Sequence, residues 1–291
     1  MIIQHNLAGM NSSRNKGITE SKMKKSLEKL SSGYRINRAG DDAAGLAISE
    51  LMRSQIRGLN QAMKNTNDGI GLTQTGDGAL AEVHSMLERM KTLAIQSANG
   101  TYNSVARGNL DDERAQLLDE IDRIGITTNF DEIPLFDSSD PDETWKPADG
   151  APFVPPEKSL EGDIPLQIGH SKEETMDVPR YYMSSKGLAI DGIDISTLKD
   201  AQRAVGMIDE AIEAVADIRA GFGASQNHLE HTYQNLSVTS ENMTSAESRI
   251  RDTDMADEIT SFTRDNIMYQ AGNSMCAQAN SLPQMVMNLL Q

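Results

Sequence analysis

Hydrophobic residues recur at helical spacing through the C-terminal half of the chain. From Leu198 to Val215 the apolar positions follow steps of three and four residues, and from Phe222 to Ile250 they recur at every seventh residue. Such spacing places side chains on one helical face, and a sustained seven-residue repeat is typical of a coiled coil. The pattern therefore predicts one long helix over residues 198–250. Its candidate packing residues are Val205, Ile208, Ile212 and Val215.

The N-terminal half carries a second pattern of this kind. Between Ile48 and Met63 the apolar steps are close to an 11-residue repeat, and from Leu80 to Ala94 they return to three and four. The pattern predicts a helix over residues 41–99, which would be about 90 Å long at 1.5 Å per residue. Its candidate packing residues are Leu80, Val83, Leu87 and Met90.

A shorter helix is expected directly after the second pattern. Gly100 is well placed as the C-terminal cap of the preceding helix. Apolar residues from Leu110 to Ile124 then predict a third helix, with Ser104 or Asn109 as its N-cap.

The middle of the chain differs from both flanks. Eight of the nine prolines lie between Pro134 and Pro179, and residues 131–180 contain 13 acidic residues against four Lys or Arg. Proline interrupts helices, so neither long helix can continue through this stretch. We expect a separate, exposed insert built from loops and a hairpin.

Neither long apolar stripe can be buried by its own helix, so the two helices are expected to pack on each other. The predicted fold is mainly α: a long antiparallel coiled-coil rod from N- and C-terminal helices, with a small β-hairpin and loop insert at the tip. The predicted domains are terminal arms at 1–40 and 252–291, a helical rod at 41–130 and 185–251, and the insert at 131–184.

Both chain ends carry apolar residues that could meet in the paired arms. A bundle of only two helices is too thin to bury these side chains, so we expect the arms to become ordered only when other subunits supply contacts. The candidate assembly residues are Ile3, Leu7, Met10, Met275, Ala279, Leu282, Val286 and Leu289.

Composition excludes several classes of function. Only 4% of residues are aromatic, which suits thin helical bundles, and the net charge of -16 disfavours binding to nucleic acid. No apolar stretch reaches 18 residues, so no membrane span is expected, and residues 1–14 lack the pattern of a secretory signal. Cys276 is the single cysteine, so the chain has no intrachain disulfide and no cysteine-based zinc site.

Several motifs resemble those of the bacterial flagellins. LSSGYRINRAGDDAAGLA, from Leu30 to Ala47, looks like the flagellin N-terminal signature, and LAIQSANGT follows from Leu93. In the second half, QNHLEHTYQNL from Gln226 and AESRIRDTDMA from Ala246 resemble flagellin as well. The resemblance covers residues 1–130 and 185–291, whereas the insert matches only at Asn129-Phe130 and Leu166-Gln167-Ile168-Gly169. Its short length implies a short flagellin without large outer domains.

The resemblance implies a non-enzymatic subunit that needs no cofactor and polymerises into the extracellular flagellar filament. It also implies export, without a cleaved signal, through the flagellar type III apparatus with the help of an export chaperone. Filament cap and hook-associated proteins would be further partners. A hook-filament junction protein is the alternative among structural proteins, and a flagellin with metal-dependent peptidase activity is the alternative among enzymes.

Four residues at three places depart from the family pattern. His228 stands where the family usually has Arg, Cys276 where it usually has Leu, and Asp131-Glu132 where Gly usually follows Asn-Phe. The first two lie on the assembly helices, so subunit contacts there are expected to differ in detail.

Three further patterns admit a chemical and a structural interpretation. His228 and His231 are spaced to share a metal, but the order His-Leu-Glu-His differs from that of a metalloprotease. A glycine-rich run could cradle phosphate, but close helix packing is favoured; it comprises Gly69, Gly71, Gly76 and Gly78. Basic residues between Arg14 and Arg38 could bind an anionic surface, but complementarity to acids between Asp252 and Asp265 is favoured.

A receptor outside the bacterium is also implied by the resemblance. Toll-like receptor 5 recognises many flagellins through a strip of the rod, and the matching positions here are Arg89, Leu93 and Glu113. Arg89 and Leu93 are four residues apart and share a helical face, so they form a candidate binding anchor, although the same strip could serve filament assembly alone.

Overall fold

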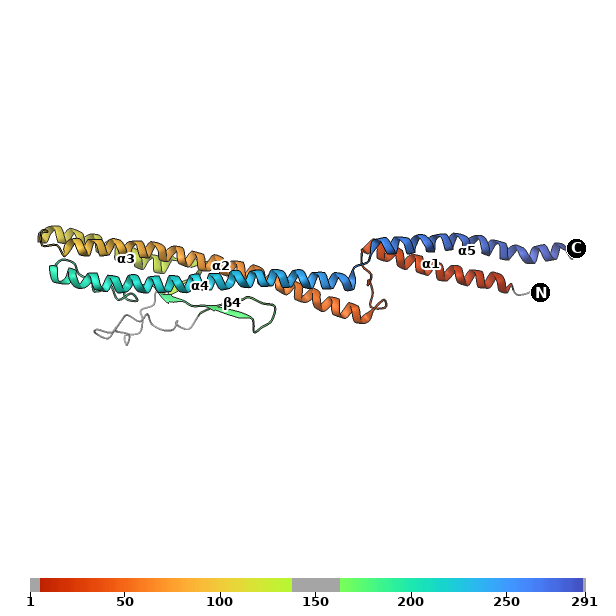
Figure 1. Ribbon diagram of the computed structural model, residues 1–291, viewed down its shortest axis with the longest axis horizontal. Coiled ribbons are helices and arrows are strands. Elements are labelled where there is room, and N and C mark those ends of the chain that lie inside the picture. Colours follow the sequence, from red (N-terminus) through yellow and green to blue (C-terminus); the bar gives the residue numbers. More distant parts are fainter. Residues whose placement is uncertain (1–5, 138–162, 290–291) are drawn as a thin grey trace. The chain divides into compact units, whose positions relative to one another are not determined.

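The computed structural model describes residues 6–137 and 163–289, without the side chains of residues 137 and 282–289. The described residues form five α-helices and three short two-stranded sheets (Figure 1). The chain divides into two compact units. The terminal unit comprises residues 1–57 and 240–291, and the central unit comprises residues 58–239.

Helices α1 (Leu7–Ser32) and α5 (Met255–Leu289) make up most of the terminal unit. Asn6 caps α1 because its side-chain oxygen accepts a hydrogen bond from the Gly9 N–H at 3.0 Å. Gly33 ends α1 in the left-handed conformation, at φ 76°, which glycine adopts without steric cost. Asp254 caps the N-terminus of α5, since its Oδ1 accepts a hydrogen bond from the Ala256 N–H at 2.9 Å.

Helices α1 and α5 lie side by side, as the sequence predicted (Figure 1). The Asn6 amide donates to the Ala279 carbonyl at 2.8 Å, and Cys276 Sγ lies 3.2 Å from Ser12 Oγ. Nearer the other end of the pair, Lys29 Nζ lies 3.5 Å from Glu258 Oε2. These contacts join residues more than 200 positions apart, so the two ends of the chain pair along the length of α1.

Helices α2 (Ala43–Ser97), α3 (Ser104–Thr127) and α4 (Leu198–Arg251) have ends close to those predicted. Two predicted caps were wrong. Asn103 caps α3, since its side chain accepts from the Ala106 N–H at 2.7 Å, and Ser104 is already helical. Gly100 is not left-handed, because Gly33 is the only glycine with positive φ among the described residues. The Arg107 guanidinium instead donates to the carbonyl of Ser97, the last residue of α2, at 3.0 Å.

The described parts of the insert form short strands. β1 (Asn129–Phe130) and β2 (Ile133–Pro134) make a tight antiparallel turn, while β3 (Phe136–Asp137) pairs in parallel with β6 (Tyr181–Tyr182). β4 (Ile164–Gln167) and β5 (Thr175–Val178) form the predicted hairpin.

The position of this hairpin differs from the prediction. It lies alongside α2 and α4 and not beyond their ends (Figure 1). The Asn65 amide donates to the Gln167 carbonyl at 3.0 Å, and Leu166 packs against Gly69. The physical reason is that the hairpin has its own apolar residues to bury. Val178, on β5, is almost fully buried in the same core as the helices.

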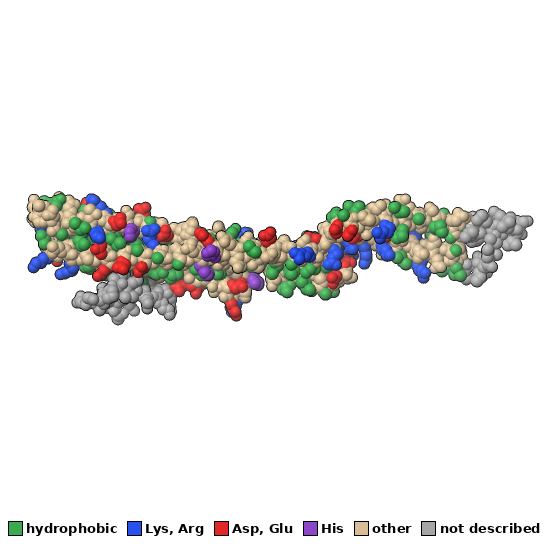
Figure 2. Space-filling view, in the orientation of Figure 1, with side chains coloured by type: hydrophobic (Ala, Val, Ile, Leu, Met, Phe, Trp, Pro, Cys, Tyr) green, Lys and Arg blue, Asp and Glu red, His purple; other side chains and the backbone are tan. Residues whose placement is uncertain are grey.

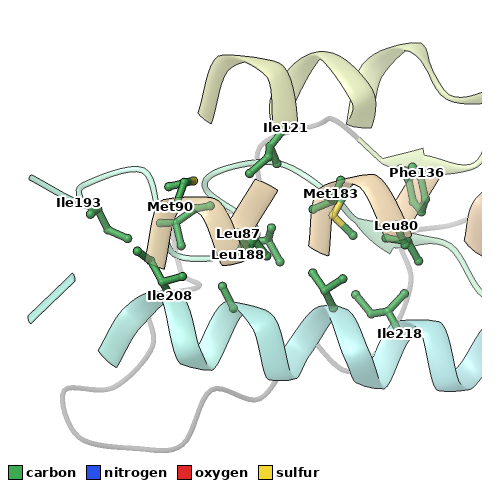
Figure 3. Packing of buried hydrophobic residues seen from close by; sticks show 14 of the residues in the cluster. Leu80, Leu87, Met90, Ile121, Phe136, Met183, Leu188, Ile193, Ile208 and Ile218 are labelled. Atoms are coloured by element: carbon green, nitrogen blue, oxygen red, sulfur yellow. The ribbon is translucent and has the colours of Figure 1, made fainter. Parts of the chain in front are cut away.

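The core of the central unit is formed by three helices and the insert together. Figure 3 shows Leu87 and Met90 of α2 facing Ile208 of α4, with Ile121 of α3 on the other side. Phe136 of β3 completes the core and packs edge-on against Phe222 of α4, with ring centroids 6.4 Å apart. The insert therefore contributes side chains that the three helices lack.

Ion pairs cross between α2 and α4 beside this core. Lys91 Nζ lies 2.5 Å from Asp209 Oδ1, and Arg219 Nε lies 2.8 Å from Asp77 Oδ1. Both pairs are partly exposed, so each adds little to the free energy of unfolding. They do show which residues of the two antiparallel helices lie opposite each other. Within the described ranges, no helix is both long and apolar enough to cross a membrane.

Candidate assembly site

The central unit buries its apolar stripe within a single chain. Of the candidate packing residues, six are fully buried and two, Val205 and Ile212, are partly buried against the same core. The fully buried set is Leu80, Val83, Leu87, Met90, Ile208 and Val215. A core closed in this way needs no second subunit.

Polar contacts that the sequence did not reveal fix the segment between β6 and α4 against the helices. The Asp122 carboxylate on α3 accepts from both the N–H and the hydroxyl of Ser185, at 2.6 and 2.8 Å. The buried Ser97 hydroxyl, at the end of α2, donates to the Ile195 carbonyl. Gly125 is required on α3 because any side chain there would collide with the Met183 carbonyl. These residues share no sequence pattern, since their partners lie far away in the chain.

The terminal unit leaves its apolar residues uncovered. Leu7 is 62% exposed, Met10 64% and Met275 63%, and Ile18, Leu27 and Ile267 are also at the surface. Figure 2 shows apolar side chains spread over the surface of both helices of this pair. Large exposed apolar residues gathered on one pair of helices favour a surface that binds another protein. The α1/α5 pair is therefore the candidate assembly site.

The predicted pairing of these residues with one another was wrong in the single chain. Leu7, Met10 and Met275 point outward, and Ala279 is the buried apolar member of the set, at 8% exposed. Two helices offer one narrow contact line, and a small residue such as alanine suits it, so large side chains remain outside. Ile3 lies outside the described residues, and the side chains of Leu282, Val286 and Leu289 are likewise not described.

Charges within the terminal unit complement each other only in part. Lys29 pairs with Glu258 across α1 and α5, as the complementarity prediction requires. Asp254 instead caps α5, and Asp252 accepts from the Ser248 hydroxyl at 2.6 Å. Two of the acids expected to balance the basic run therefore serve local backbone geometry.

A compact joint links the two connectors of the terminal unit. The Arg35 N–H donates to the Arg251 carbonyl at 2.7 Å, and the Thr253 N–H donates to the Gly33 carbonyl at 3.0 Å, so residues 33–35 and 251–253 pair like short strands. Arg251 Nη1 lies 2.6 Å from Glu50 Oε1, and this hydrogen bond holds the pKa of the Glu50 carboxyl below its ordinary value.

The candidate receptor residues have different environments. Arg89 Nη2 and Glu113 Oε1 lie 2.6 Å apart on the exposed surface of α2 and α3. Leu93 is fully buried in the core of the central unit, so its prediction as part of an exposed anchor was wrong. A spacing of four residues places side chains on roughly one face, but α2 is covered by α3 and α4 on different sides, which separates the two.

The structure gives two glycines of the glycine-rich run a packing role. Gly69 and Gly76 lie inside the continuous helix α2. A Cβ at Gly69 would lie 2.6 Å from the Leu166 side chain, and a Cβ at Gly76 would lie 3.2 Å from the Phe222 ring, so close packing accounts for both glycines. Gly78 has no neighbour within 4 Å of such a Cβ, and nothing in the structure explains it. In the part of the chain that the structure describes, no three His, Cys, Asp or Glu residues are grouped to hold a metal.

Comparison with known proteins shows the family of the chain. Residues 3–140 match the bacterial flagellin N-terminal helical region, and residues 205–290 match the bacterial flagellin C-terminal helical region. A flagellin of Halalkalibacterium halodurans is 48% identical over the full length of both chains. The chain belongs to the bacterial flagellins.

Two further comparisons extend this result. The flagellin of Bacillus subtilis is 43% identical and also aligns over the full length of both chains. A solved structure from Vibrio parahaemolyticus, described as a flagellar hook-associated protein, superimposes with a TM-score of 0.57 over 73% of this chain and 100% of its own. At 14% identity that likeness shows the helical fold alone. Flagellins are structural proteins of the extracellular flagellar filament and not enzymes, and the chain shares that role.

Proposed function

We propose that this flagellin polymerises through the α1/α5 pair, and that the terminal arms, residues 1–40 and 252–291, form the inner contacts of the filament. The observation that carries the proposal is the contrast between the two units. The candidate packing residues of the central unit are buried within one chain, whereas the candidate assembly residues Leu7, Met10 and Met275 of the terminal unit remain more than 60% exposed. Further copies of the same pair are the partners that would cover them.

The rod in this proposal comprises residues 41–130 and 185–251, and the insert comprises residues 131–184. We infer that the chain reaches the filament by type III export with an export chaperone, and that it adds among cap and hook-associated proteins. The family membership supports this route. The exposed apolar arms support it too, because an export chaperone that covers this surface would prevent polymerisation before the subunit reaches the filament.

Seeded polymerisation tests the proposal. Leu7→Gln and Met275→Gln remove apolar surface while keeping good helix formers at both positions. Burial of each side chain is worth about 1.5–3 kcal/mol, so the double variant should raise the critical concentration by at least about tenfold. Val105→Gln is the matched control, since Val105 is 71% exposed on α3 of the central unit.

Circular dichroism should show the same melting of the central unit in both variants. Equal critical concentrations for the double variant, the control and the parent protein would contradict assembly through this helix pair.

A receptor interaction is the second candidate, and the exposed Arg89–Glu113 pair favours it. We propose that monomeric protein presents this pair to Toll-like receptor 5, with Arg89 as the anchor and Leu93 supporting the helix from inside. Arg89→Ala should weaken binding of the receptor ectodomain by about 1–3 kcal/mol. Arg123→Ala is the control, because Arg123 forms a comparable exposed pair with Glu120 on α3. Equal binding by all three proteins would show that Arg89 is not an anchor.

A further inference from the structure

Met176 and His228 bring a thioether and an imidazole together at the surface of the central unit. Met176 lies on β5 and His228 lies on α4, and His228 Nδ1 is 3.1 Å from Met176 Sδ. His228 is exposed and Met176 is half-buried, so the pair is open to solvent. The two residues are 52 positions apart, and only the packing of the hairpin on the helix makes them neighbours.

The backbone on both sides of this contact is well anchored. Leu166 faces Met176 across the hairpin, and the side chains of Leu166 and Leu229 both pack at Gly69 of α2. Leu229, next to His228, is fully buried. The hairpin and α4 are thus fixed to the same point of α2, which holds the thioether and the imidazole together while their outer atoms stay accessible.

The two donor atoms suit a particular class of metal ion. Thioether sulfur is a soft ligand that selects Cu(I) and similar ions, and imidazole nitrogen binds copper as well, whereas Mg²⁺ and Ca²⁺ require oxygen ligands.

The spacing of the donors is compatible with an ion between them. Zinc bonds to imidazole nitrogen and to thiolate sulfur, which serve as a guide, are about 2.0 and 2.3 Å long, and at a tetrahedral angle such bonds place the two donors about 3.5 Å apart. The observed 3.1 Å would have to open by only a few tenths of an ångström. Methionine is unbranched and flexible, so a rotation of its side chain can supply this change and also a wider angle.

We propose that Met176 and His228 form a binding site for a soft monovalent metal ion of the Cu(I) class. The site lies on the central unit, apart from the α1/α5 pair, and it does not depend on the proposed route of assembly. His231, one helical turn further along α4, is not part of it, because the thioether contact is made by His228.

Silver ion is the appropriate probe, since Ag⁺ is soft, monovalent and stable in air. The test uses full-length monomer carrying Cys276→Ser, which removes the competing thiol, in a chloride-free buffer. Isothermal titration should show one saturable site, and binding should shift both the Met176 ε-methyl and the His228 ring signals in NMR spectra. Met176→Leu and His228→Asn should each weaken binding by at least about tenfold, or about 1.4 kcal/mol.

His231→Asn is the matched control and should leave the affinity within about twofold, a difference of less than 0.5 kcal/mol. Thermal unfolding of each variant establishes that the fold is kept. The proposal is overturned if the monomer has no saturable Ag⁺ site, or if Met176→Leu binds as tightly as the parent protein. It is equally overturned if His231→Asn loses as much affinity as His228→Asn, since the ion would then bind the histidine pair.

Discussion

The guanidinium of Arg251 lies 4.8 Å from the centroid of the Tyr34 ring, where the end of α4 meets the connector between α1 and α2. The same guanidinium pairs with Glu50, and its Nε is buried without a hydrogen-bond partner in the described structure. Arg251 therefore contacts both connectors and the first turns of α2. This arrangement makes it the central residue of the joint within the terminal unit.

Arg251→Lys should loosen this joint while keeping the charge. Lysine cannot stack a flat guanidinium on the Tyr34 ring, an interaction worth about 0.5–1 kcal/mol. Hydrogen exchange should become faster in residues 33–42 and 251–254 and stay unchanged in the core of the central unit. Arg249→Lys is the control, because Arg249 makes an exposed hydrogen bond to Ser245 of its own helix. Equal exchange in both variants would exclude Arg251 as the central contact.

The joint should weaken in acid. The hydrogen bond from Arg251 lowers the folded-state pKa of Glu50, so ionised Glu50 stabilises the joint at pH values above about 4.3, the usual glutamate pKa. This contribution disappears as the pH falls through the lowered folded-state pKa. An NMR titration of the Tyr34 ring should show the change. Glu50→Gln should remove that pH dependence, and an unchanged titration in this variant would assign it to another group.

Glu132→Gly should stabilise the central unit. Asp131 and Glu132 form the two-residue turn between β1 and β2, with φ of 51° and 66°, a left-handed conformation that glycine favours. Relief of this conformation, less the entropy cost of glycine, should raise the free energy of unfolding by about 0.5–1 kcal/mol. Glu173→Gly, which removes the same charge from the other turn, should not stabilise. Denaturant unfolding of the two variants distinguishes turn geometry from charge.

Residues 138–162 should be dispensable for assembly, whereas the strand before them should not. This segment lies outside the described residues, and its prolines and acids predict few contacts with the helices. Replacing it with a short Gly/Ser linker should leave the polymerisation rate and the filaments intact. Phe136→Ala should lower the free energy of unfolding by about 3–5 kcal/mol, since Phe136 is almost fully buried. Filaments lost on linker replacement, with normal thermal unfolding, would place this segment in an assembly contact.

The arms should be cleaved in the monomer and protected in the filament. Their exposed apolar residues bury little surface in one chain, so limited proteolysis should remove roughly the first and last 40 residues. Cys276, half-buried beside Ser12, should react with a thiol reagent faster in monomer than in filament. Equal rates would place Cys276 on a surface that faces solvent in both states.

The sequence by itself determined the helices and their partners in broad terms. Steps of three, four and seven residues located α2 and α4 to within a few residues, because an amphipathic helix must repeat its apolar positions at that period. The cluster of prolines located the insert, because proline interrupts a helix. Family motifs at both ends identified the class of protein.

Only the tertiary structure decided which side chains are inside and which distant residues meet. Leu93 and Arg89 are spaced to share a helical face, yet Leu93 is buried and Arg89 is exposed. Leu7 and Met275 occupy apolar positions that a pair of helices cannot cover. The contact between Met176 and His228, and the support that Asp122 gives to Ser185, join segments between 52 and 63 positions apart. Periodicity reports the local geometry of one helix, whereas these contacts depend on how the hairpin and the connecting segment pack against it, and no local pattern encodes that packing.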